Sequence, residues 1–202
     1  MRFDVIVFDF DGTLVQSVDI KAQAFFDVFP GSVEYKKIIG GVLTEDPDGS
    51  RTRVIPVMWQ RMVEAGLPLP AGQSPQDRID AYGEEVFRRV AVCPEMAGAT
   101  DLLHALHNQT AVYVASNTLD APLKALLQER GWTDLLSGAF GFPHRKADVL
   151  LSLLLSHETT PDRIMMVGDG PSDADAARRA GTEFFPVRGA DALIELNKAL
   201  FS

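Results

Sequence analysis

Short apolar runs along the chain have the pattern of buried parallel strands. They span residues 5–8, 111–115, 164–167 and 184–187, with a weaker candidate at 138–142. Between the later runs, leucine and alanine recur at helical spacing. These helical segments span residues 99–107, 119–130, 147–157 and 172–180. The alternation of strand and helix predicts an α/β fold with a Rossmann-like parallel sheet that helices cover on both faces.

The stretch from about residue 15 to residue 90 breaks this rhythm, because its apolar residues sit only at helical spacing. Apolar stripes lie within 22–29 and 54–63, and a serine-capped helix begins at Ser74-Pro75-Gln76-Asp77. Turn-rich links, among them Gly40-Gly41 and residues 46–49, separate these helices. The pattern predicts two domains, an α/β core of residues 1–15 and 91–202 and an all-helical cap of residues 16–90.

The amino-acid composition limits the classes of partner that the protein is expected to bind. The chain has 202 residues, 46% of them hydrophobic, which is enough for a sizeable core, and a formal net charge of −9. This charge argues against nucleic acid or an anionic membrane as the main partner. Cys93 is the sole cysteine, so no intrachain disulfide forms and a reducing compartment fits best. The apolar start at residues 3–8 is too short to span a bilayer and lacks the features of a signal peptide, so we expect a cytoplasmic protein.

Polar and charged residues recur where the predicted strands end. The carboxyl ends of parallel strands meet at one edge of a sheet, which is where ligands bind in open α/β folds. The one-residue gap between the first two aspartates also places both on one face, provided that the chain stays extended there. The residues expected at this edge are Asp9, Asp11, Ser116, Asn117, Lys146, Asp169 and Asp173.

These residue types suit a metal ion and a phosphate. Mg²⁺ prefers oxygen ligands, and a cluster of acids needs such a cation before an anionic substrate can approach. Lys146 can offset negative charge, and Ser116 and Asn117 can donate hydrogen bonds to phosphoryl oxygens. Gly12 lets backbone N–H groups come close to a phosphate. His144 and Arg145, directly before Lys146, fall near the mouth of such a site.

Other interpretations of single residues remain open at this stage. Ser116 also fits the cap of the following helix, and Asp173 also fits an ordinary acid in a first helical turn. Lys124 is the nearest rival to Lys146, although it falls in the middle of a predicted helix.

In these motifs the chain resembles the haloacid dehalogenase superfamily. The resemblance is to its phosphatase branch with a helical cap inserted after the first strand, which includes phosphoglycolate phosphatase-like and β-phosphoglucomutase-like members. The chain departs from the family pattern at Ala147, where proline is frequent, and at Gly170, where a hydroxyl residue is frequent. The matching segments are Asp9-Phe10-Asp11-Gly12-Thr13-Leu14, Ser116-Asn117, Lys146 and Gly168-Asp169-Gly170-Pro171-Ser172-Asp173.

The resemblance implies a two-step phosphoryl transfer. Asp9 would attack phosphorus and form an aspartyl-phosphate. Asp11 would protonate the leaving oxygen and then act as the base for the attacking water. The groups that would hold Mg²⁺ are the Asp9 carboxylate, the Asp11 backbone carbonyl and the Asp169 carboxylate, with Asp173 as a ligand or a supporting residue. The residues that would bind or orient the phosphoryl group are Thr13, Ser116, Asn117 and Lys146.

The resemblance therefore predicts a Mg²⁺-dependent phosphomonoester hydrolase that acts on a small phosphorylated metabolite. Threonine at position 13 favours hydrolysis, and the presence of Asp11 argues against a dehalogenase. Two alternatives remain: a sugar-phosphate mutase with the same intermediate, and a non-catalytic protein that binds a phosphorylated ligand. Phosphoglycolate, sugar phosphates and nucleotides all remain open as substrates, and so does the oligomeric state.

Overall fold

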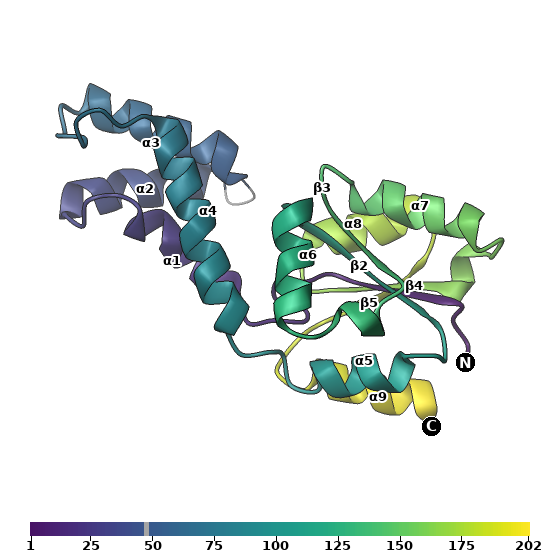
Figure 1. The fold of residues 1–202 in the computed structure, drawn as a ribbon. Helices are drawn as coiled ribbons and strands as arrows, with labels where there is room; N and C mark the ends of the chain where they lie inside the picture. Colours follow the sequence, from purple (N-terminus) through teal and green to yellow (C-terminus); the bar gives the residue numbers. More distant parts are fainter. Residues whose placement is uncertain (47–48) are drawn as a thin grey trace. The chain divides into compact units, whose positions relative to one another are not determined.

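The computed structural model describes residues 1–46 and 49–202, so the predicted turn at residues 46–49 lies partly outside the described residues. The chain divides into two compact units, Met1–Ser17 with Val90–Ser202, and Val18–Arg89 (Figure 1). The boundaries expected from the sequence lie within two residues of these. That the two units act as catalytic core and cap stays a prediction.

The first unit is built on a five-stranded parallel sheet with the strand order β3-β2-β1-β4-β5, which confirms the predicted fold class. The chain starts at the central strand, builds outward to β3, and then crosses back to β4. The point where the order reverses, between β1 and β4, is where an open α/β sheet offers a ligand site. The strands are β1 (Val5–Phe8), β2 (Ala111–Leu119), β3 (Gly138–Phe142), β4 (Ile164–Gly168) and β5 (Glu183–Pro186).

Helices cover both faces of this sheet (Figure 1). Helices α7 (Lys146–Ser156) and α8 (Pro171–Ala180) pack together on one face. Helices α5 (Ala99–Leu106) and α9 (Ala192–Phe201) pack together on the other, while α6 (Asp120–Glu129) contacts β2 and β3. The sequence analysis did not predict α9.

Burial on both faces explains why the strands read as continuous apolar runs. All four residues of β1 are fully buried. Val5 and Val7 belong to the core cluster that includes Leu150 of α7 and Ala177 of α8, and the alternate residues of the strand point to the opposite face. Each such side chain contributes roughly 1.5–3 kcal/mol on burial, so the sheet and both helix layers stabilise one another.

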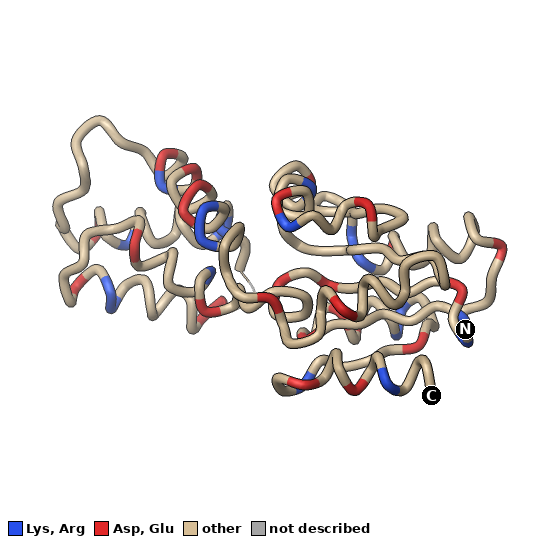
Figure 2. Tube along the Cα trace, turned by 60° about the horizontal axis from the view of Figure 1, so that its bottom comes forward, with Lys and Arg blue, Asp and Glu red and all other residues tan. Residues whose placement is uncertain are grey.

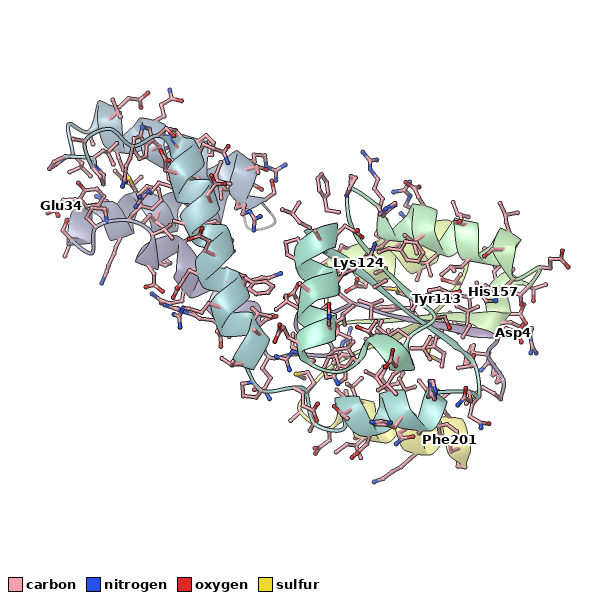
Figure 3. All side chains as sticks on the ribbon, viewed as in Figure 1. Asp4, Glu34, Tyr113, Lys124, His157 and Phe201 are labelled. Atoms are coloured by element: carbon pink, nitrogen blue, oxygen red, sulfur yellow. The ribbon has the colours of Figure 1, made fainter. Side chains whose placement is uncertain are left out.

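A polar contact ties the end of α7 to the sheet. In Figure 3 the labelled Tyr113 of β2 and His157, which directly follows α7, point toward one another. The Tyr113 hydroxyl lies 3.0 Å from Nε2 of His157. His157 lies toward the labelled Asp4, which precedes β1, whereas Tyr113 pairs with Val7 within the sheet.

The second unit is all-helical within its described residues. It consists of α1 (Val18–Asp27), α2 (Val33–Glu45), α3 (Arg51–Glu64) and most of α4 (Pro75–Val92). The Ser74 backbone N–H donates to the Asp77 carboxylate at 2.6 Å, as the predicted helix start requires. The ring of Tyr82 on α4 packs 4.4 Å from that of Phe25 on α1, measured between ring centroids.

The expected link at Gly40-Gly41 is wrong, because helix α2 runs straight through both glycines. Each glycine in a helix interior costs about 1 kcal/mol relative to alanine. Tyr35, Ile39 and Val42 lie on one face of α2 and are buried. Packing of this face outweighs the weak local propensity, which the sequence pattern alone did not reveal.

Acidic and basic residues are interspersed along the helices of both units (Figure 2). None of the described helices combines the length and the apolar character needed to cross a bilayer.

Candidate active site

Three carboxylates meet at the carboxyl edge of the sheet. Asp9 follows β1, Asp169 follows β4, and Asp173 lies in the first turn of α8. One carboxylate oxygen from each lies within 4.8 Å of the others. The backbone N–H of Asp9 donates to the carbonyl of Val167 at 2.8 Å, so the pairing of β1 with β4 sets the spacing between Asp9 and Asp169. Asp9 and Asp173 are buried, whereas Asp169 is only partly covered and reaches solvent.

The structure brings Lys146, and not Lys124, to this cluster. Lys146 is the first residue of α7 and is 5% exposed. Its Nζ lies 2.9 Å from Oδ1 of Asp9 and 2.5 Å from Oδ1 of Asp173. Lys124 on α6, labelled in Figure 3, instead pairs with Asp120 at 2.8 Å on the same helix. Helix α7 therefore places a buried ammonium between two buried carboxylates.

The electrostatics of the cluster suit a divalent cation. Burial raises the pKa of Asp9 to about 7, and the Asp173 and Asp11 carboxylates add to the rise while Lys146 opposes it. Partial burial likewise raises the pKa of Asp169. Burial alone would lower the pKa of Lys146, but Asp9 and Asp173 outweigh it and raise this pKa. One ammonium faces three carboxylates, so these oxygen donors fit a hard cation such as Mg²⁺ in both chemistry and charge.

The chain does not stay extended through Asp11, so the condition under which Asp9 and Asp11 would share one face of a strand is not met. Strand β1 ends before Asp9, and the chain turns at once around the fully buried Phe10. The Val15 N–H donates to the carbonyl of Phe10 at 3.2 Å, and the Gly12 N–H donates to the carbonyl of Val15 at 2.9 Å. Gly12 has a φ of +75°, a conformation that strains residues with a side chain. The chain therefore turns directly after the strand, and the Asp11 carboxylate still lies near enough to raise the pKa of Asp9.

Hydroxyl groups hold the Asp11 carboxylate. Ser17 Oγ donates to Asp11 Oδ1 at 2.7 Å, and Thr118 Oγ1 donates to Asp11 Oδ2 at 2.7 Å. Ser116 Oγ lies farther away, at 3.4 Å from Oδ2. The sequence analysis missed Ser17 and Thr118. Thr118 was within reach of that analysis, because it lies two residues after Ser116 on the same strand and so shares its face.

The residues expected to bind phosphate occupy different environments. Thr13 is fully buried, and its hydroxyl donates to Oδ1 of Asp169 at 3.2 Å. Ser116 is buried within β2 and accepts the N–H of Thr118 at 3.1 Å, so it does not cap α6. Asn117, next to it, is exposed and lines the same hollow as Lys146. Contact of these residues with a phosphoryl group stays a prediction.

Close packing leaves no room for a side chain at Gly168, the residue before Asp169. A Cβ at Gly168 would lie 2.3 Å from Cγ of Asp173, well inside contact distance. The Asp173 carboxylate is also held by the N–H of Gly170, which donates to Oδ2 at 3.0 Å. The end of β4 and the start of α8 therefore approach closely around one buried carboxylate.

Together these features define an α/β protein with an acid-rich, metal-competent site at the switch point of a parallel sheet. A family model for haloacid dehalogenase-like hydrolases matches residues 3–181, and the chain belongs to this family. A comparison with curated proteins found no match.

Solved structures share the fold at low sequence identity. A haloacid dehalogenase-like family hydrolase from Xanthomonas campestris superposes with a TM-score of 0.75 at 16% identity, covering 99% of this chain and 91% of that one. A predicted phosphoglycolate phosphatase from Haemophilus somnus 129pt gives a TM-score of 0.66 at 21% identity, covering 92% of this chain and 85% of that one. CbbY from Rhodobacter sphaeroides, in complex with phosphate, gives a TM-score of 0.64 at 18% identity, covering 93% of this chain and 87% of that one.

Proposed function

We propose that the protein is a Mg²⁺-dependent phosphomonoester hydrolase that acts on a small phosphorylated metabolite through an aspartyl-phosphate on Asp9. The observation that carries the proposal is the buried Asp9 carboxylate beside Asp169, Asp173 and Lys146. Family membership supports hydrolysis. The CbbY structure contains phosphate, and a phosphate ligand on this fold is consistent with the same substrate class.

Asp9 is arranged to act as a nucleophile. Its Oδ1 accepts the Phe10 N–H at 2.7 Å and the Lys146 ammonium at 2.9 Å, which fixes the carboxylate and leaves Oδ2 for attack. A bond forms between Oδ2 and phosphorus as the ester P–O bond breaks. Water then attacks the phosphorus and releases phosphate, which restores the Asp9 carboxylate.

Asp11 is the proton carrier in this proposal. It gives a proton to the leaving ester oxygen in the first step and takes one from the attacking water in the second. The hydroxyls of Ser17 and Thr118 orient its carboxylate. Because these donors come from different segments, they restrict the rotation of the side chain at both oxygens.

A bound Mg²⁺ would supply charge neutralisation at the acids and at the phosphoryl oxygens. Asp9, Asp169 and the backbone carbonyl of Asp11 would hold it, with Asp173 as a ligand or a support. Thr13 orients Asp169 through the hydroxyl contact described above. Lys146, Ser116 and Asn117 would bind the phosphoryl group.

We further propose a cytoplasmic location and no nucleic-acid or membrane partner. The support is compositional: one cysteine and a formal net charge of −9. The helical unit Val18–Arg89 would serve as the cap that sets specificity.

Metal removal tests the proposed reaction. Phosphate release from p-nitrophenyl phosphate is expected to fall at least about a hundredfold when excess chelator replaces Mg²⁺, and to return when Mg²⁺ is restored, because the acid cluster then repels the substrate. Turnover of no phosphate ester under either condition would point to a binding protein. Transfer of the phosphoryl group to glucose phosphate, without net phosphate release, would point to a mutase.

The raised pKa of Asp9 makes Mg²⁺ binding pH-dependent. This pKa rises from 3.8 to about 7 on folding, so in the metal-free protein a proton occupies the carboxylate increasingly as the pH falls below 7. A proton and Mg²⁺ compete for the same group. The Mg²⁺ affinity, measured by calorimetry without substrate, is expected to weaken roughly tenfold from pH 8 to pH 6. An affinity that stays constant over this range would contradict the assignment of Asp9 as a ligand.

A further inference from the structure

A hollow of about 260 Å³ opens beside the phosphoryl edge of the first unit. It lies between the segment that joins β3 to α7 and one face of α8. Its lining includes Lys146 and Asn117, two residues of the site already described, and we call the rest of the lining its outer part. The polar and aromatic residues of its outer part are Phe142, His144, Arg145, Ser172, Asp175 and Arg179.

The outer part carries unpaired positive charge. Arg145 immediately precedes α7 and Arg179 lies on α8, and neither guanidinium has an ion pair or hydrogen bond with another described residue. The single acid of the hollow, Asp175, is already paired with Arg178 at 2.5 Å on the same helix. In a protein with a net charge of −9, two free guanidinium groups around one hollow form a local site for an anion.

The wall of the hollow also has an apolar portion. Phe142, at the end of β3, is 56% exposed, whereas ten of the twelve phenylalanines are buried or half-buried. Ala147 adds a small apolar surface at the start of α7. A short carbon chain could therefore pass along this wall between the phosphoryl edge and the two arginines.

We propose that this hollow binds a second anionic group of the substrate, a carboxylate or a phosphate, carried a few carbon atoms from the phosphate ester. Arg145 and Arg179 are the specificity-determining residues, and Phe142 contacts the intervening carbon chain. The inference rests on the proposed function, because it takes the phosphoryl group to lie at Lys146 and Asn117. An uncharged alcohol as leaving group would leave both guanidinium groups unpaired.

Matched phosphonates that cannot be hydrolysed test the proposal by binding alone. The probes are ω-carboxyalkylphosphonates and α,ω-alkyldiphosphonates with two to four carbons, each compared with the plain alkylphosphonate of equal length. Calorimetry is done with the full chain and excess Mg²⁺. For at least one length, the second anion is expected to tighten binding about tenfold, because a guanidinium–anion contact is a charge-assisted hydrogen bond. The two probe series distinguish a carboxylate from a phosphate as the bound group.

Variants then locate the effect. In the double variant Arg145→Gln/Arg179→Gln, the affinity ratio between dianionic and plain probes is expected to collapse to below about twofold. Arg2→Gln, at an exposed arginine that does not line the hollow, is the matched control and keeps the ratio. Equal affinities in the wild type at every length, or a ratio that survives in the double variant, would overturn the proposal. A protein that shows the ratio but turns over no phosphate ester, including the dianionic ones, would support the anion subsite and disprove the hydrolase.

Discussion

Asp9→Asn is expected to reduce Mg²⁺-dependent phosphate release from p-nitrophenyl phosphate by at least about a thousandfold. An amide oxygen cannot form the acyl-phosphate bond on which the proposed reaction depends. The substitution preserves shape, and the amide oxygen can still accept hydrogen bonds from Lys146 and from the backbone N–H of Phe10. The loss is therefore expected in kcat with little change in folding, which circular dichroism and thermal unfolding would check.

Asp101→Asn is the matched control, since it makes the same chemical change on an exposed position of α5. It is expected to retain full activity. Turnover that persists in Asp9→Asn after the preparation has been shown free of contaminating phosphatase would disprove Asp9 as the nucleophile. Such a result would leave the metal site intact but require another route to phosphorus.

Lys146→Met is expected to lower the free energy of unfolding by about 3 kcal/mol in chelator at pH 7.5. The methionine is unbranched like lysine and only one atom shorter, but it leaves the buried carboxylates of Asp9 and Asp173 without their shared cation. Removing one partner of a buried ion pair is costly because the remaining charge is neither solvated nor compensated. Activity is expected to fall as well. Urea unfolding monitored by fluorescence would measure the loss.

A second lysine variant shows whether the loss of stability is specific to the buried Lys146. Lys124→Met breaks an ion pair on α6 whose lysine side chain is 57% exposed, so a change below about 0.5 kcal/mol is expected. Adding Asp173→Asn to Lys146→Met is expected to recover part of the lost stability, because it removes one of the orphaned charges. Equal losses in Lys146→Met and Lys124→Met would show that the buried pairs do not stabilise the fold.

Much of the core fold followed from local pattern. Strands such as β1 are buried on both faces, so every residue is apolar and the run stands out in the sequence. Helix α2 did not stand out, because Gly40 and Gly41 interrupt its local propensity while the buried Tyr35 and Ile39 support it through packing. Local propensity is visible in a sequence, whereas the gain from packing depends on a partner surface.

The same division applies to the candidate site. The aspartates at positions 9, 169 and 173 were predicted to meet because each follows or adjoins the end of a strand, and their oxygens do gather within 4.8 Å. The donors Ser17 and Thr118 were not foreseen, since a serine after a turn carries no marker of what it contacts. The sequence analysis also missed Arg179, which lines the hollow proposed to bind a second anion. An arginine on a helix surface has no distinguishing sequence pattern, and only the fold places it beside Arg145.

Residue types and their order along the chain were enough to predict which groups gather at one edge of the sheet: hard oxygen donors, a lysine and hydroxyl groups at strand ends. Only the folded chain shows that Lys146 bridges Asp9 and Asp173, that the backbone turns after Phe10, and that two arginines line one hollow. The reason is physical. Strand ends converge by topology, which a linear pattern encodes, but the partner of each side chain depends on distances that packing sets.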